Sequence, residues 1–83
     1  MITQNTVEKI IKDAVKVNLQ EFKKARKEYL RWRKRRENAT SELEAKTFEV
    51  HENEMFYVYY TIKQTLVRLF PDHEDLIMDE LYS

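Results

Sequence analysis

The sequence contains no glycine and no cysteine, and its single proline is Pro71. Phosphate-binding loops, dinucleotide-binding turns and nucleophile elbows need glycine where the backbone takes positive φ or approaches a ligand closely. None of these motifs can therefore form here in its usual way. The lack of cysteine excludes a disulfide framework and a thiolate metal site, and it fits the reducing cytoplasm, which we take as the expected location.

Long apolar stretches are also missing. The first residues lack the basic start and apolar run of a secretion signal, and no segment approaches the roughly 20 apolar residues of a membrane span. We therefore expect no contact with a membrane. The 83 residues allow one domain, residues 1–83, and its core would be so small that a partner subunit is an option from the outset.

The residues that are present predict an all-α fold. Charged residues make up 36% of the chain, which suits long solvent-facing helices, and no Asn-Gly or Asp-Gly pair marks a β-hairpin. We predict a helix from about residue 6 to 37, a turn over 38–41, a helix over about 42–70 and a short helix over about 73–82.

Local signals mark the helix ends. A short polar residue is followed three positions later by an acid in three places, Asn5 with Glu8, Ser41 with Glu44, and Asp72 with Asp75. Only the second pair is a strict capping box. At the end of the first helix, Asn38 can take the left-handed conformation that glycine usually supplies, and Pro71 ends the second helix.

Apolar residues recur at helical spacing in both long segments. In the first helix they are Val7, Ile11, Ala14, Phe22, Ala25, Tyr29 and Trp32. The second helix has one stripe of Met55, Val58, Tyr59, Ile62, Leu66 and Leu69, and another of Phe56, Tyr60 and Val67, with Lys63 between them. The alternative for residues 55–62 is a strand, because aromatic and β-branched residues favour sheets. The helical period continues through Leu69, which favours the helix.

The length of the helices suggests a second copy of the chain. A helix of 32 residues is about 48 Å long, whereas an 83-residue globule is roughly 30 Å across. Either the first helix is broken, or the two helices form an elongated antiparallel hairpin whose second stripe is covered by the short third helix or by another subunit. We predict a homodimeric helical bundle made of two such hairpins.

The predicted dimer interface contains Asn18, Phe56, Tyr60 and Val67. Asn18 lies near the centre of the stripe on the first helix. It is either a buried polar residue that fixes the register of paired helices or a residue that reaches solvent where the helix bends.

The charges are unevenly distributed although the net charge is zero. Residues 1–36 hold twelve Lys or Arg and four acids, whereas residues 37–83 hold three and eleven. The segment from Lys23 to Arg36 has nine cations and one acid, with Phe22, Tyr29 and Trp32 close by or interleaved. Such a cluster can bind the phosphates of nucleic acid while bases stack on the aromatic rings.

Pairing within the hairpin explains part of the same charge. In a hairpin that turns near residues 39 and 40, the facing pairs are Arg35 with Glu44, Lys27 with Glu52, and Arg26 with Glu54. Trp32 would then be a core residue. Six consecutive helical residues span all faces, so some cations must still point away, and we expect that Arg31, Lys34 and Arg35 do not share one direction.

Catalytic and metal-binding motifs are missing. Of the two histidines, only His51 has an acid at ligand spacing, Glu54, whereas a transition-metal site normally needs three or four ligands. We also find no serine or threonine with a plausible base and orienting acid. The sequence therefore predicts no enzymatic activity, no cofactor, no metal and no small-molecule substrate.

Two functions fit these observations. The first is a protein-interaction module, acting as a regulator, adaptor or inhibitor, that binds a partner through the basic end of its first helix and its acidic C-terminal segment. The second is a small nucleic-acid-binding protein or transcriptional regulator that uses residues 23–36. For both functions the predicted contact residues are Lys27, Arg31, Arg33, Lys34, Arg35 and Arg36.

Overall fold

The structure, a computed structural model, describes residues 3–83 and is helical over most of this range. Helix α1 spans Gln4–Glu37, α2 spans Glu42–Leu69 and α3 spans Glu74–Leu81, with the 3-10 turn η1 at Pro71–His73 before α3. Residues 55–62 lie within α2, and residues 3–83 contain no strand. The all-helical prediction is therefore confirmed, and the strand alternative is wrong.

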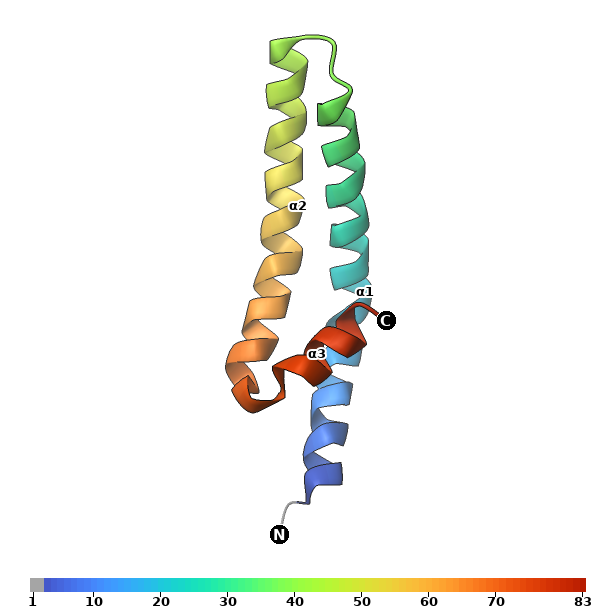
Figure 1. Ribbon diagram of the computed structural model, residues 1–83, viewed down its shortest axis with the longest axis vertical. Coiled ribbons are helices and arrows are strands. Elements are labelled where there is room, and N and C mark those ends of the chain that lie inside the picture. Colours follow the sequence, from blue (N-terminus) through green and yellow to red (C-terminus); the bar gives the residue numbers. More distant parts are fainter. Residues whose placement is uncertain (1–2) are drawn as a thin grey trace.

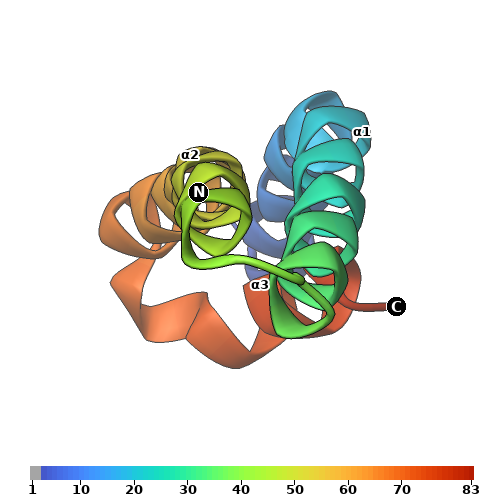
Figure 2. The ribbon, with the colours of Figure 1, turned by 90° about the horizontal axis from the view of Figure 1, so that it is seen from above.

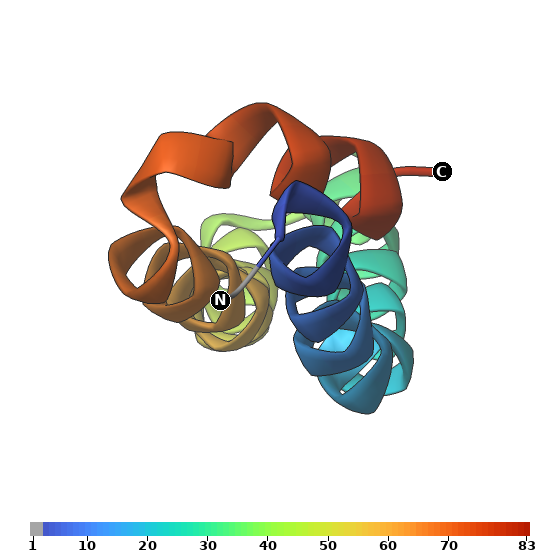
Figure 3. The ribbon, with the colours of Figure 1, turned by 90° about the horizontal axis from the view of Figure 1, so that it is seen from below.

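Helices α1 and α2 form a long antiparallel hairpin, as predicted (Figure 1). The molecule measures 60 × 19 × 17 Å, and its radius of gyration of 16.2 Å exceeds the about 12 Å of a compact domain of this length. Helix α3 crosses the half of the hairpin that lies away from the turn and contacts both long helices (Figure 1). Seen along the hairpin, the three helices form a triangle at that end (Figures 2 and 3). Completion by a second copy stays a prediction.

Helix α1 begins one residue before the predicted cap. The side chain of Thr3, not of Asn5, closes the first turn, because its Oγ1 accepts a hydrogen bond from the N–H of Thr6 at 3.2 Å. Asn5 lies inside the helix, so the predicted cap is wrong. Thr3 has the extended backbone and the hydroxyl that a cap requires.

The capping box of α2 is confirmed in its main part, since Ser41 Oγ accepts a hydrogen bond from the N–H of Glu44 at 3.1 Å. The predicted cap at Asp72 is wrong. Asp72 lies within η1, and α3 starts directly after this turn without a side-chain cap. Pro71 supplies the fixed φ that starts η1 and thereby ends α2.

Asn38 ends α1 without the left-handed conformation that we predicted. Its φ is −103°, and no residue in the described part of the chain has positive φ. The Nδ2 group of Asn38 instead donates to the carbonyl of Lys34 at 3.0 Å, and its backbone N–H bonds to the carbonyls of Lys34 and Arg35. The side-chain amide of Asn38 thus satisfies a carbonyl at the end of α1, where a glycine in the left-handed conformation is common.

The hydrophobic core lies where the three helices meet. Its buried members are Ile11, Val15, Phe22, Ala25, Tyr59, Leu66, Ile77 and Leu81. Phe22 is at the centre, with its ring centroid 5.6 Å from that of Tyr59 in α2 and 5.3 Å from that of Tyr82 after α3. Both contacts are edge-to-face, a geometry worth about 0.5–1.5 kcal/mol beyond simple burial.

The predicted apolar stripes are confirmed in part. In α1, the residues Ile11, Phe22 and Ala25 are buried, and the sequence pattern missed Val15, which is buried as well. In α2, Leu69 is 65% exposed, contrary to the prediction. The chain turns toward α3 directly after Leu69, so no helix covers this side chain.

The second stripe of α2 is largely uncovered in the single chain. Phe56 and Tyr60 are each about 40% exposed, and their rings stack with centroids 5.3 Å apart. Val67 is half-buried against the core. Asn18 is half-buried, and its Nδ2 donates to the carbonyl of Ala14 in its own helix at 2.9 Å. This local bond satisfies the Asn18 amide without a partner subunit.

We expect Phe22→Ala to lower the free energy of unfolding by about 3–5 kcal/mol, because it empties the centre of the core. Chemical denaturation followed by circular dichroism measures this loss. Val17→Ala, at a side chain that is 83% exposed on the same helix, should change the free energy by less than about 0.5 kcal/mol. Equal losses for the two variants would contradict the placement of the core.

A pH prediction follows from the core position of Tyr59. Burial, followed by the neighbouring phenols of Tyr29 and Tyr82, raises the pKa of Tyr59 above its usual 10.0. The neutral phenol is therefore favoured in the folded state, and its contribution to stability is complete below about pH 10 and declines as the pH rises further. Tyr59→Phe should lose less stability between about pH 9 and pH 11 than the wild type does. Identical losses would contradict this assignment, and measurement near pH 7 controls for the missing hydroxyl.

Candidate interaction site

One ion pair joins α1 to α2 near the turn of the hairpin. The Nε of Arg36 donates to both carboxylate oxygens of Glu52, at 2.8 and 3.1 Å. The Glu52 side chain is only 8% exposed, and Glu52 is the one buried charged residue within residues 3–83. The hydrogen bond to Glu52 and the charge of its carboxylate raise the pKa of Arg36, so its guanidinium stays charged. Arg36 thus belongs to the packing of the hairpin.

This ion pair corrects the predicted pairing of charges. Among residues 3–83, no ion pair joins Arg35 to Glu44, Lys27 to Glu52, or Arg26 to Glu54. The prediction counted outward from the turn, whereas the facing residues must lie on the inward side of both helices. Glu52 is the acid on that side of α2, and the long Arg36 side chain reaches it. Arg26 instead lies over the Tyr82 ring at 5.1 Å.

Trp32 lies between the two long helices and beside two arginines. Its ring stacks on that of His51 with centroids 4.4 Å apart, and it contacts Phe48 at 5.7 Å. The guanidinium of Arg35 is 4.8 Å from the Trp32 centroid, and that of Arg31 is 5.7 Å away. Trp32 is half-buried and lies outside the buried core cluster, so it is less enclosed than we predicted.

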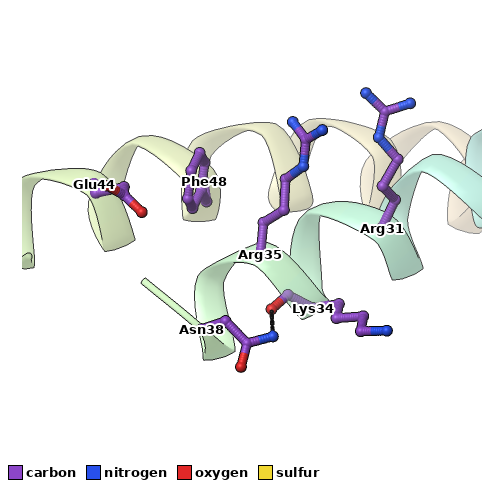
Figure 4. Close-up of a pocket in the computed structure, with 6 residues that line it drawn as sticks. All are labelled: Arg31, Lys34, Arg35, Asn38, Glu44 and Phe48. Atoms are coloured by element: carbon purple, nitrogen blue, oxygen red, sulfur yellow. Dashed lines mark hydrogen bonds between the residues drawn. The ribbon is translucent and has the colours of Figure 1, made fainter. Parts of the chain in front are cut away.

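Three of the predicted contact residues line one surface cleft of about 440 Å³. The cleft is lined by Arg31, Lys34, Arg35 and Asn38 from the end of α1 and by Glu44 and Phe48 from the start of α2. Arg31 and Arg35 point to the same side of the helix pair, whereas Lys34 points away from them (Figure 4). As expected, the three side chains do not share one direction, and the two arginines lie together because helical residues four apart are on one face.

The other predicted contact residues have different surroundings. Lys27 is exposed and borders a second cleft between α1 and the C-terminal residues. Arg33 is half-exposed and its Nε lies 3.3 Å from a carboxylate oxygen of Glu37 in the same helix. Because Lys27 and Arg33 lie elsewhere and Arg36 points toward α2, only three of the six predicted residues line the first cleft.

The basic surface of α1 is longer than the predicted segment of residues 23–36 and begins at Lys9. The outward face of α1 carries nine exposed cations, Lys9, Lys12, Lys16, Lys23, Lys24, Lys27, Arg31, Lys34 and Arg35, and the acids among them are Asp13 and Glu28, which pairs with Arg31. From Lys9 to Arg35 this face extends about 39 Å along the helix. The spacing of three or four between many of these cations was the signal that could have revealed it.

The histidine and acidic side chains of residues 3–83 do not gather into a larger cluster. These residues contain no group of three or more His, Cys, Asp or Glu side chains placed to bind a metal ion. His51 Nδ1 is 3.9 Å from a carboxylate oxygen of Glu54, which is a single contact between two exposed polar groups. None of the helices in residues 3–83 combines the length and the apolar character needed to cross a membrane.

Comparison with known proteins adds no relative. No family model, no curated protein and no solved structure matches this chain. The class defined by the fold and the site is a small helical hairpin protein with a basic surface on α1 and a cleft at its turn end. Any function must be argued from these features.

We expect Arg36→Ala to lower the melting temperature much more than Arg33→Ala. The first change leaves the buried Glu52 carboxylate without its donor, whereas the second removes an exposed pair worth about 0.3–0.5 kcal/mol. The double variant Arg36→Leu with Glu52→Leu should recover most of the melting temperature lost in Arg36→Ala, because two apolar side chains need no charge compensation. Thermal unfolding followed by circular dichroism gives the comparison. A similar effect of Arg33→Ala and Arg36→Ala would contradict the structural role of Arg36.

Proposed function

We propose that this protein is a non-enzymatic protein-interaction module that binds an acidic segment of a partner protein at the cleft between Arg31, Arg35 and Phe48. The observation that carries this proposal is the placement of two guanidinium groups on one side of the helix pair, next to an aromatic wall (Figure 4). Such a module would act as a regulator, adaptor or inhibitor of its partner.

The two arginines are suited to carboxylates. A guanidinium offers parallel N–H donors that match a carboxylate in a bidentate pair. Arg35 is partly ordered by its contact with the Trp32 ring, which lowers the entropic cost of binding. Arg31 contacts Glu28 at 3.4 Å in an exposed pair, and such pairs are weak enough to be exchanged for a partner's acid.

The mixed character of the cleft supports a protein partner. Phe48 provides an apolar wall, and Glu44 adds a carboxylate at the end of the cleft near the turn. A protein segment can present an acid to Arg31 and Arg35 and an apolar or basic side chain to the other wall. A phosphate chain offers mainly negative charge, which Glu44 repels.

Nucleic-acid binding is the second candidate, and the nine exposed cations on the outward face of α1 favour it. Their length of about 39 Å is sufficient for contacts with several phosphates of a duplex. The aromatic residues do not support stacking of bases, because Phe22 is buried and Tyr29 and Trp32 are half-buried between helices. This second function would therefore consist of phosphate contacts that are independent of sequence.

The predicted homodimer and the cytoplasmic location are also part of the proposal. The rings of Phe56 and Tyr60 support a second copy, because about 40% of each side chain is left exposed in the single chain. The absence of cysteine from the sequence supports a reducing compartment.

The double variant Arg31→Ala with Arg35→Ala tests the cleft. We expect it to bind partners recovered with the wild-type protein at least about tenfold more weakly, since one charge-assisted hydrogen bond contributes about 1.5 kcal/mol. Lys12→Ala with Lys16→Ala removes two exposed cations of the same helix far from the cleft and should retain partner binding. Affinity purification followed by titration of the identified partner provides the measurement.

Titration of random duplex DNA at about 50 and 200 mM salt separates the two candidates. A protein-interaction module will bind DNA weakly at the higher salt concentration. If duplex DNA is the ligand, both double variants will weaken binding for all sequences, and the salt slope will fall by about one unit per lost phosphate contact. If the cleft variant keeps every interaction of the wild type, the proposed site is refuted.

A further inference from the structure

We infer that the outer face of α2 is the contact surface of an antiparallel homodimer, in which the α2 helices of two copies pack side by side. This inference rests on the proposed self-association and specifies its surface and its orientation. The surface consists of Val50, Asn53, Tyr57, Tyr60, Gln64 and Val67.

The spacing of these residues is that of a coiled coil. Val50, Tyr57 and Gln64 are seven residues apart, and Asn53, Tyr60 and Val67 form a second series with the same interval. All six lie within a sector of about 100° on α2, counted at 3.6 residues per turn. A seven-residue repeat keeps such a seam in contact with a partner helix along its length.

This face is mostly exposed, although Gln64 and Val67 are half-buried, and its charged neighbours are Lys46, Glu49 and Arg68. Val50 and Tyr57 are more than half exposed, and Asn53 is exposed as well. Helix α2 buries the opposite side, where Tyr59 and Leu66 enter the core. A shallow cleft of about 320 Å³ on the outer face is lined by Tyr57, Tyr60, Thr61, Gln64, Thr65 and Arg68. None of the six proposed contact residues is ionisable near neutral pH.

The face is complementary to itself when two copies run in opposite directions. We place the twofold axis between Val58 and Tyr59. Each layer of the seam then pairs a residue of one copy with a residue of the other. The pairs are Tyr57 with Tyr60, Asn53 with Gln64, and Val50 with Val67. Rings therefore meet rings, amides meet amides and aliphatic groups meet aliphatic groups. Amide pairs within an apolar seam fix the register of the two helices.

Charge also favours this orientation. In a parallel dimer Lys46, which continues the second series of the seam, would face Lys46 of the second copy. In the antiparallel dimer Lys46 instead lies opposite the C-terminal end of α2 of the second copy, so the two Lys46 side chains are far apart. At the edges of the seam, Glu54 faces Thr61 and Lys63 faces Phe56, so no like charges oppose each other.

The proposed dimer leaves the interaction cleft accessible. The contact lies on the outer face of α2, whereas Arg31 and Arg35 project from α1 (Figure 4). Two equal clefts would then face in different directions on one particle. A partner with two acidic segments would gain affinity from binding both clefts, provided that its linker spans them.

Light scattering at about 100 µM chain tests the surface. The wild type should have about twice the mass of the 10.2 kDa chain, and Tyr57→Glu should be monomeric with unchanged helix content, because it places carboxylates beside the twofold axis. Val17→Glu, at an exposed position on α1, is the matched control and should stay dimeric. A monomeric wild type refutes both the self-association and this surface. A dimeric wild type together with a dimeric Tyr57→Glu refutes the surface alone.

Disulfide cross-linking tests the orientation, since the chain has no cysteine of its own. Asn53→Cys mixed with Gln64→Cys should form a disulfide between the two variants in a glutathione buffer. Neither variant should cross-link to itself, because residue 53 of one copy lies about 16 Å along the axis from residue 53 of the other, beyond the about 7 Å limit between Cα atoms. Efficient self-cross-linking of Asn53→Cys would show a parallel dimer and refute the proposal, as would the absence of any cross-link.

Discussion

The position of Glu52 on the inward side of α2 is the constraint on which the turn end of this hairpin depends. A carboxylate removed from water carries a penalty of several kcal/mol unless a cation with good geometry compensates it. Arg36 provides this compensation through two hydrogen bonds from its Nε. Because Arg36 must point toward α2, the rotation of α1 about its axis is fixed over its last turns. Trp32, one turn earlier, then faces α2 and stacks on His51.

The same rotation determines which cations stay available for binding. With Trp32 and Arg36 turned inward, Arg31 and Arg35 project to one outer side and border the cleft with Phe48. The basic segment is thus divided between packing and surface, although its residue types are nearly uniform. At the other end of the hairpin Phe22 joins all three helices through Tyr59 and Tyr82. The long hairpin is therefore held by an apolar junction near α3, by ring contacts of Tyr29 and Trp32 with α2, and by an ion pair near the turn.

The sequence predicts those parts of this structure that depend on local signals. Ser41 and Pro71 mark helix boundaries by effects that act within a few residues, and the predicted bounds of α2 differ from the observed ones by a single residue. Counting from the turn gives the register of the hairpin to within a few residues, since Trp32 contacts Phe48 and Phe22 contacts Tyr59. It could not show which long side chain reaches Glu52 across the interface. For the cleft, the sequence identifies the cations, and the four-residue spacing of Arg31 and Arg35 places both on one face of α1. The inward role of Arg36 required the three-dimensional position of Glu52.

The division of the basic segment is tested most directly by hydrogen exchange of the arginine Nε–H groups, followed by nuclear magnetic resonance at near-neutral pH. The Nε–H of Arg36 is bound to a nearly buried carboxylate, so its exchange with water should be the slowest among the arginines, and Glu52→Gln should accelerate it. The Nε–H groups of Arg31 and Arg35 should exchange rapidly in the free protein. Exchange of Arg36 as fast as that of Arg31 and Arg35, unchanged by Glu52→Gln, would contradict the account.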